Sequence, residues 1–263
     1  ELAVAWGLAG DPERAVELLD RALWIEEQIY GSDDVQVAAT LANLGSAHGA
    51  LGDAEMKRDL LQRALQIEER HYGPGHAQLA ATLVGLGSAH GALGDAQRQR
   101  ELLERALRIQ EQCYGPEHAE VADTLTILSN AHGALGSKRM QKLLLERALA
   151  IQEQHYGREH LRVAATLTAL AGARGALGDA QGQAELLARV LPVLERCHGP
   201  EHEEVATTLY SLAQVHQKLG HMEEAEELLE RAYDIWLAHY GEEHPHTDLA
   251  RRELKRLGKL NSN

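Results

Sequence analysis

The sequence repeats itself every 42 residues. A ring-bearing residue followed by glycine returns at this interval six times along the 263 residues, at Tyr30-Gly31, Tyr72-Gly73, Tyr114-Gly115, Tyr156-Gly157, His198-Gly199 and Tyr240-Gly241. Self-similarity with a period of roughly 20 to 50 residues is typical of chains that stack one small structural unit many times. The repeat therefore predicts an array in which each unit contacts only its neighbours.

Each unit carries two apolar stripes with helical spacing. In the first half, Val37, Leu41, Leu44, His48 and Leu51 follow one another at intervals of three and four residues, which predicts a helix that we call helix A. The second half predicts a helix B, whose stripe consists of Leu60, Leu61, Ala64, Leu65 and Ile67. Because neither helix can bury its stripe alone, consecutive pairs are expected to stack side by side.

Turn residues mark both ends of each helix. Gly52 can end helix A in the left-handed conformation, and Asp53 can cap the start of helix B. The same cap position holds Asp11, Asp53, Asp95, Ser137 and Asp179, with His221 as the exception. The longer connection from helix B to the next helix A reads Tyr-Gly-Pro-Glu-His at Tyr114 to His118, and its proline prevents helix B from continuing.

Composition supports helices and excludes two classes of partner. The chain has no Phe and only 4% aromatic residues, so a core of Leu and Ala in closely packed helices is expected. Its net charge of −14 argues against binding nucleic acid, because proteins that bind phosphate backbones concentrate positive charge. No apolar run approaches the roughly 18 residues that a membrane helix needs, and we expect a cytoplasmic protein without a membrane partner.

The unit resembles a known family. Leu44-Gly45, His48, Gly52, Leu61 and Ala64 resemble the signature of tetratricopeptide repeats, with Leu41 at the usual tryptophan position. The 42-residue period, the Tyr-Gly-Pro-Glu-His loop and the Val-Ala-x-Thr-Leu start of helix A are similar to the kinesin light chain and nephrocystin type. The resemblance implies an all-α fold, a right-handed α–α superhelix of about six helix-turn-helix repeats.

The resemblance covers essentially the whole chain and predicts a single solenoid over residues 1–263. The expected units are about 1–31 with a partial helix A, 32–73, 74–115, 116–157, 158–199, 200–241, and 242–263 as a C-terminal capping helix. Two family positions differ here. Early helix B carries Lys57, Gln99, Gln141 and Gln183 where a small residue is usual, which should loosen its contact with helix A or change its angle. Late helix A carries His48, His90, His132, Arg174 and His216 where an aromatic residue is usual.

In this family helix A lines a concave surface, so the resemblance also indicates where a ligand binds. The corresponding positions are mostly Ala, Gly, Ser and Thr, which lets a helix or an extended segment with apolar side chains approach closely. Small residues can equally serve only to pack adjacent A helices. The expected peptide-binding contacts are Asn43, Ser46, Ser88, Thr126, Asn130, Thr168, Tyr210 and Gln214.

We expect a non-enzymatic scaffold that binds a protein or peptide partner, such as an apolar helix, in this groove. The lysine and asparagine cluster with which chaperone-binding members hold a terminal carboxylate is missing, since its positions hold Ala42, Val84, Thr126, Thr168 and Tyr210. The groove also lacks positive charge for acidic cargo peptides. Two alternatives stay open: a self-association module that pairs identical chains as a homo-oligomer, and a regulatory sensor arm of a larger multidomain protein.

Other residues that could carry chemistry recur as part of the unit. Equivalent histidines lie in different units, roughly 10 Å or more apart, and zinc requires ligands within about 2 Å of one ion. We therefore expect no metal and no cofactor, and assign a capping or loop-packing role to His76, His118, His160, His202 and His244. Cys113 and Cys197 stand two units apart and should be free thiols. No nucleophile, phosphate loop or carboxylate pair stands apart from the repeat.

Three features interrupt the pattern. Pro192 falls inside a helix B, where it removes a hydrogen bond to the carbonyl of Ala188, and we expect this unit to be the softest. The last helix, with Arg251, Arg252, Lys255 and Arg256, is expected to act as a polar cap. Residues 1–9 match only the latter part of a helix A, with Trp6 at the position of His48, so an exposed apolar face is expected at that end.

Overall fold

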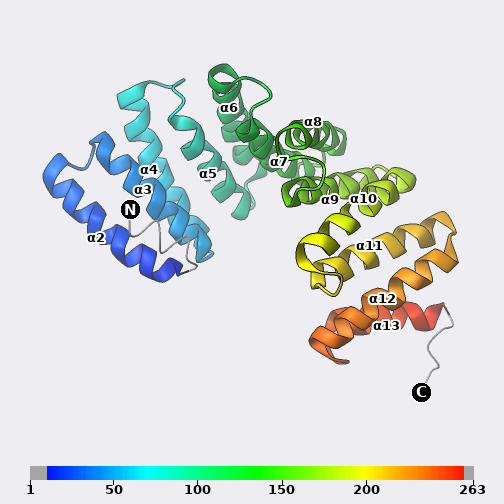
Figure 1. Ribbon diagram of the computed structural model, residues 1–263. Coiled ribbons are helices and arrows are strands. Elements are labelled where there is room, and N and C mark those ends of the chain that lie inside the picture. The colour runs from blue at the N-terminus through cyan, green and yellow to red at the C-terminus, as the bar shows by residue number, and fades with distance from the viewer. Residues whose placement is uncertain (1–10, 258–263) are drawn as a thin grey trace. The chain divides into compact units, whose positions relative to one another are not determined.

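The computed structural model describes residues 11–257, and within them it contains twelve α-helices and no strand (Figure 1). The expected partial helix A at residues 1–9 lies outside the described residues. The chain divides into two compact units, Glu1–Ser137 and Lys138–Asn263. The fold class expected from the repeat, an all-α array of about six helix-turn-helix repeats, is confirmed.

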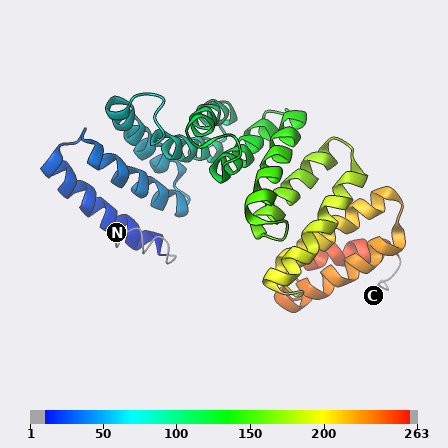
Figure 2. The ribbon, with the colours of Figure 1, turned by 45° about the horizontal axis from the view of Figure 1, so that its top comes forward.

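The first unit alternates B and A helices. Its helices are α2 (Pro12–Tyr30), α3 (Val35–Ala50), α4 (Ala54–Tyr72), α5 (Leu79–Ala92), α6 (Ala96–Tyr114) and α7 (Ala119–Ala134). Here α3, α5 and α7 are A helices, and each packs against the B helix before it, while α3 and α5 also pack against the B helix that follows (Figure 2). The contacts between α3 and α5, and between α5 and α7, join successive repeats.

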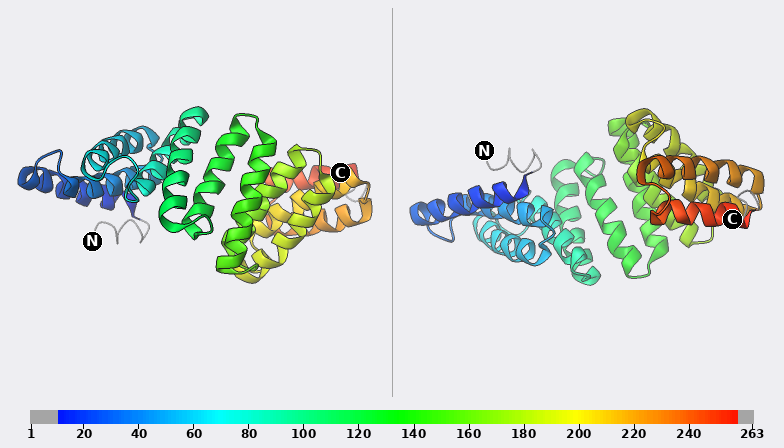
Figure 3. Two further views of the ribbon diagram at one scale, coloured as in Figure 1. Left: turned by 90° about the horizontal axis from the view of Figure 1, so that it is seen from above. Right: turned by 90° about the horizontal axis from the view of Figure 1, so that it is seen from below.

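The second unit follows the same plan. Its helices are α8 (Lys138–Tyr156), α9 (Leu161–Ala176), α10 (Ala180–His198), α11 (Glu203–Leu219), α12 (Met222–Tyr240) and α13 (Pro245–Arg256). The pairs α9–α10 and α11–α12 are antiparallel hairpins, and α13 packs on α12 (Figure 3). One cluster of buried side chains, which includes Leu167, Leu187, Leu209 and Trp236, runs continuously through these helices.

The four expected aspartate caps are present. Asp11, Asp53, Asp95 and Asp179 each accept a hydrogen bond from a backbone N–H in the first turn of the following B helix, and His221 forms no such side-chain bond. Gly52 and Gly73, with φ of 82° and 86°, end an A and a B helix in a conformation that a residue with a Cβ atom rarely adopts.

The loop histidines are N-caps as well. His118, His160 and His202 each accept a hydrogen bond at Nδ1 from the backbone N–H two residues on, over 3.3, 3.1 and 3.2 Å. Four of the five loop histidines, at 76, 160, 202 and 244, also stack on the ring that ends the preceding B helix. The capping and loop-packing role expected for these histidines is confirmed, and it explains why they recur with the repeat.

The long residues early in helix B do not loosen its contact with helix A. A Cβ atom added to Gly91 would stand 2.5 Å from the Gln99 amide nitrogen, and one added to Gly49 would stand 2.7 Å from Lys57 Cδ. The glycine of helix A thus leaves the space that the long side chain of helix B fills. In the α11–α12 hairpin the two sizes are exchanged, with Gln217 on helix A and Ala225 on helix B. The expected loosening was wrong because the sequence compensates for the change of volume across the hairpin.

Three of the five polar residues late in helix A form pairs across the turn, whereas Nδ1 of His132 and of His216 is buried without a hydrogen-bond partner. Nδ1 of His48 and of His90 lie 3.5 and 3.4 Å from the carboxylates of Asp53 and Asp95. Nη1 of Arg174 lies 3.5 Å from Asp179 in the same way. At these three positions the usual aromatic contact is therefore replaced by a side-chain pair between the end of helix A and the cap of helix B.

Successive B helices are joined by an arginine. Arg63 donates to Glu27 over 2.5 Å and to the carbonyl of Ser32 over 2.8 Å. Arg105 repeats both contacts, with Glu69 and with the Pro74 carbonyl, 42 residues later. In the second unit, Arg231 binds Glu195 and the Pro200 carbonyl. We call this recurring arrangement the arginine ladder; it fixes the loops at Ser32, Pro74 and Pro200 to the helix B that follows each of them.

Candidate functional site

The A helices keep one face open to solvent. In the second unit this face carries Ala165, Thr168 and Gly172 on α9, and Thr207 and Gln214 on α11, all of them exposed. The apolar stripe of the same helices, with Leu167, Leu170, Leu209 and Leu212, is buried. The open positions are those expected to line the groove, and small side chains leave the backbone of α9 accessible there.

A pocket of about 540 Å³ lies on this face between α9, α11 and the end of α10. It is lined by Leu161, Ala164, Ala165, Thr168, Leu194, His198, Glu204, Thr207 and Thr208. Four of the nine lining residues are alanine or leucine, and the threonine hydroxyls, the His198 imidazole and one carboxylate provide the polar groups. Among the expected contacts, Thr168 lines this pocket directly.

The threonine hydroxyls of the pocket already donate hydrogen bonds to their own helices. Thr168 Oγ1 donates to the carbonyl of Ala164 over 3.0 Å, and Thr207 Oγ1 donates to that of Glu203 over 3.0 Å. Each threonine side chain then presents the lone pairs of its hydroxyl oxygen and its methyl group to the pocket. The wall therefore accepts hydrogen bonds from a ligand, and it suits apolar side chains and N–H donors better than carboxylates.

The polar rim of the pocket comes from a break in the repeat. His198 stands where the other repeats have Tyr, and its Nε2 lies 3.5 Å from Oε2 of Glu204. Leu161, exposed at the start of α9, supplies the outer apolar wall. The sequence prediction missed Leu161, Leu194, His198 and Glu204, although the change from Tyr to His at position 198 was a visible signal.

Tyr210 and Gln214 lie further along the same face. Gln214 donates to Tyr210 Oη over 2.9 Å, and the Tyr210 ring packs against Trp236 with 5.5 Å between centroids. Burial raises the pKa of the Tyr210 hydroxyl, and the hydrogen bond from Gln214 acts in the opposite direction. Gln214 also lines a second, polar pocket of about 470 Å³ with Gln217, Lys218, Glu253 and Arg256.

The other expected contacts belong to the first unit. Asn43, Ser46 and Asn130 are exposed, whereas Ser88 and Thr126 are half-buried. The hydroxyls of Ser46, Ser88 and Thr126 donate to the carbonyls four residues before them, over 2.9, 3.0 and 2.9 Å. These five residues lie on α3, α5 and α7, and their role as ligand contacts stays a prediction.

The positions of the histidines and cysteines can be compared with the geometry that a metal site needs. Within residues 11–257, no group of three or more His, Cys, Asp or Glu side chains is arranged to hold a metal ion. Cys113 and Cys197 are free and exposed. Within the same residues, no helix has the length and apolar character needed to cross a membrane.

Comparison with known proteins agrees with this geometry. Sequence models of the tetratricopeptide repeat match residues 37–78, 79–120, 121–162 and 184–238, more than half of the chain. The chain therefore belongs to the tetratricopeptide repeat family, whose members are protein–protein interaction scaffolds. No protein with a curated description matches the sequence.

Similar solved structures indicate which type of tetratricopeptide repeat the chain contains. A putative kinesin light chain from Podospora anserina with nearly identical repeats is 28% identical, with a TM-score of 0.67 over 77% of this chain and 96% of that one. BtubC from P. vanneervenii is 20% identical, with a TM-score of 0.72 over 90% and 92% of the two chains. YrrB, described as having an unusual peptide-binding site, is 17% identical, with a TM-score of 0.57 over 88% and 98%. The repeats are thus of the kinesin light chain-like type.

Proposed function

We propose that the protein is a non-enzymatic scaffold that binds a peptide or helical segment on the open face of its A helices. The observation that carries this proposal is the pocket of about 540 Å³ between α9, α10 and α11, which coincides with the expected groove at Thr168. Its leucine and alanine walls suit an apolar side chain as anchor. The described peptide-binding site of YrrB, on a similar fold, also supports a peptide ligand.

Charge indicates the character of the partner. The pocket has Glu204 at its rim, and the chain has a net charge of −14. Like charges across an interface cost free energy and slow association, whereas opposite charges speed it. The partner segment is therefore apolar with basic flanking residues rather than acidic.

Selection from a random peptide library tests the proposal. We expect enriched sequences to combine apolar residues with Lys or Arg, and Thr168→Trp to abolish their binding by filling the pocket. Gln154→Trp, on an exposed position of α8, is the matched control and should bind as the wild type does. Enrichment of acidic sequences, or equal binding by both tryptophan variants, would overturn the assignment to this groove.

Self-association is a second candidate function, and α2 supplies the observation that favours it. Ile25 is 48% exposed, whereas its equivalents Ile67, Ile109, Ile151, Val193 and Ile235 are at most 5% exposed. Trp24 and Ile29 stand beside it, each 65% exposed. An apolar face of this kind is a usual site of protein association.

Light scattering separates the two candidates. Association through α2 predicts a mass that rises with protein concentration and a monomer for the double variant Trp24→Glu, Ile29→Lys. A monomeric wild type over the same concentrations would exclude it. The remaining alternative, a sensor arm attached to another domain, requires the longer protein for its test.

A further inference from the structure

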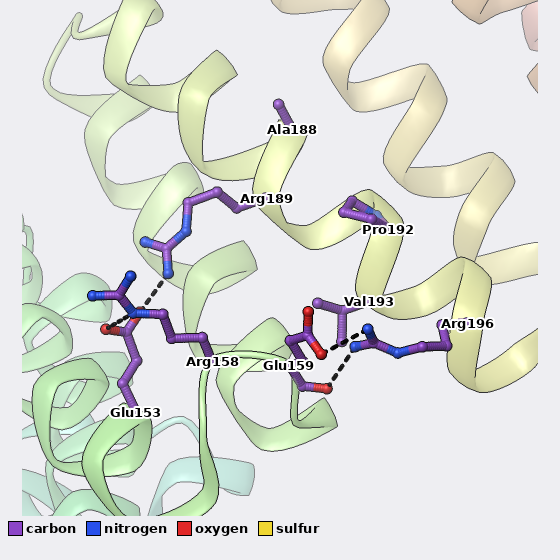
Figure 4. Close-up of a pocket in the computed structure, with 8 residues that line it drawn as sticks. All are labelled: Glu153, Arg158, Glu159, Ala188, Arg189, Pro192, Val193 and Arg196. Carbon is purple, nitrogen blue, oxygen red and sulfur yellow. Dashed lines mark hydrogen bonds and ion pairs between the residues drawn. The ribbon is translucent and has the colours of Figure 1, made fainter.

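A second pocket lies away from the groove, between α8, the loop after it and α10. Its volume is about 570 Å³, and its lining consists of Glu153, Arg158, Glu159, Ala188, Arg189, Pro192, Val193 and Arg196 (Figure 4). Three of the eight residues are arginines, in a chain with 14 more acidic than basic residues. With Glu153 and Glu159 also in the lining, the pocket keeps a net positive charge in a chain that is acidic as a whole.

The arginine ladder accounts for only part of this cluster. Arg189 and Glu153 are the ladder pair of this junction, and Arg196 with Glu159 corresponds to Arg70 with Asp33 in the first unit. Arg158, by contrast, stands where three other junctions have Pro74, Pro116 or Pro200 and a fourth has Ser32. Arg158 is therefore not part of the repeat pattern. It lines the same pocket as Pro192, which also departs from that pattern.

The geometry leaves guanidinium donors available. Arg158 and Arg189 both contact the single carboxylate of Glu153, with Arg158 Nε 3.7 Å from Oε2 (Figure 4). Arg196 contacts the carboxylate and the carbonyl of Glu159 over 2.8 and 3.3 Å. The Arg158 side chain is 81% exposed, and an exposed ion pair is weak, so Arg158 can exchange partners readily.

One wall of the pocket is apolar. Ala188, Pro192 and Val193 form it on α10, the helix that also carries Arg189 and Arg196, and Arg158 approaches from the loop after α8 (Figure 4). The three guanidinium groups are enough to bind the oxygens of one small anion. Such an anion alone would leave most of the cavity unfilled. A ligand that fills it combines a compact anionic group with an attached, less polar segment.

We propose that this pocket binds a phosphate monoester on a polypeptide, a phosphoserine or phosphothreonine, through Arg158, Arg189 and Arg196. Guanidinium forks match the oxygens of a phosphate group, which presents nearly two negative charges at one point. A run of Asp and Glu spreads its charge along the chain, whereas the phosphate group places it at one point between the arginines. This site does not depend on the groove of the A helices, so either proposal can fail without the other.

Nuclear magnetic resonance and peptide binding test the site together. Inorganic phosphate, titrated into the whole chain at fixed ionic strength, should shift the Nε–Hε resonances of Arg158, Arg189 and Arg196. A degenerate peptide library with a central phosphoserine should bind, and the same library with serine should not. Arg158→Ser, which restores the residue found at the first junction, should weaken both kinds of binding about tenfold, the effect of losing one charge-assisted hydrogen bond.

Two variants serve as controls. Arg70→Ser removes the counterpart of Arg196 in the first unit and should leave phosphate binding unchanged. Ser32→Arg adds the third arginine there and should create a new phosphate-dependent shift at Arg63. The proposal is overturned if phosphate shifts none of the three arginines, if Arg158→Ser binds as the wild type does, or if the serine library binds equally well. The proposal would also be overturned if nucleotides or phosphoinositide vesicles bind to the protein and the phosphoserine library does not.

Discussion

At the scale of single residues, helix B and the next helix A are joined by a buried hydrogen bond whose acceptor differs from repeat to repeat. Thr166 donates to the amide oxygen of Gln152 over 2.6 Å, and Thr82 donates to a carboxylate oxygen of Glu68 over 3.1 Å. Gln110 occupies the same place in the repeat between them. Glu68 is thus an acid, like Glu26 one repeat earlier, where the next two repeats have the amides Gln110 and Gln152, and its second oxygen is buried without a hydrogen-bond partner.

We predict that Glu68→Gln stabilises the protein. Burial raises the pKa of Glu68, and the hydrogen bond from Thr82 opposes this only in part. Because the folded pKa lies above that of the unfolded chain, the ionised wild type loses stability as pH rises through the folded value. The variant should therefore gain about 1 kcal/mol at pH 7, the scale of one buried hydrogen bond, and nothing below the ordinary pKa of glutamate. Denaturant unfolding of both proteins between pH 4 and 8 measures the difference, and a constant difference over this range would contradict the prediction.

A second prediction concerns the exchange of volume across the hairpin. Gly91→Gln should destabilise the protein by about 1 to 3 kcal/mol, because the new side chain meets buried Gln99. The double variant with Gln99→Ala reproduces the Gln217 and Ala225 pair and should recover most of this loss. A double-mutant cycle in urea gives the coupling, expected at about 1 to 2 kcal/mol. Additive effects would mean that the two positions do not share one space.

At the scale of helices and hairpins, the sequence was sufficient for the elements but not for their contacts. The period, the Asp caps and the glycines placed the helices because these signals act locally. The fit of the Gln99 side chain against Gly91 could not be predicted from such local signals, because the two residues belong to different helices. The pocket residues Leu194 and His198 were missed for the same reason: they belong to the end of a helix B, and only packing brings them onto the face of α9 and α11.

The arginine ladder leads to a prediction at this scale. Arg105→Ala should cost about 1 to 2 kcal/mol, because it leaves half-buried Glu69 and the Pro74 carbonyl without a donor. The expected loss of stability is small because both side chains are still about one third exposed, and water screens their attraction. Arg108→Ala, at an exposed position of the same helix, should change stability by less than about 0.5 kcal/mol. Equal effects of the two variants in thermal unfolding would show that the ladder adds nothing.

At the scale of the whole molecule, stability is distributed among repeats that contact only their neighbours. Such arrays open locally where one repeat is weak, without unfolding as one unit. The weakest hairpin should be α9–α10, because Pro192 lies inside α10 and cannot donate to the Ala188 carbonyl. Gly172, Gly175 and Gly182 in the same hairpin add backbone freedom in the unfolded chain.

Hydrogen exchange, followed peptide by peptide, should reveal this weakness. We expect amides of α9 and α10 to exchange faster than those of α5 and α6, which form the equivalent hairpin of the first unit. Pro192→Ala should slow exchange in α10 and raise stability by about 1 to 3 kcal/mol, since it restores a helical hydrogen bond. Ala150→Pro, the same exchange at the equivalent position of α8, should speed exchange there. Uniform protection along residues 11–257, or no response of α10 to Pro192→Ala, would show that the proline is accommodated without loss, and the local weakness would then have to come from the glycines alone.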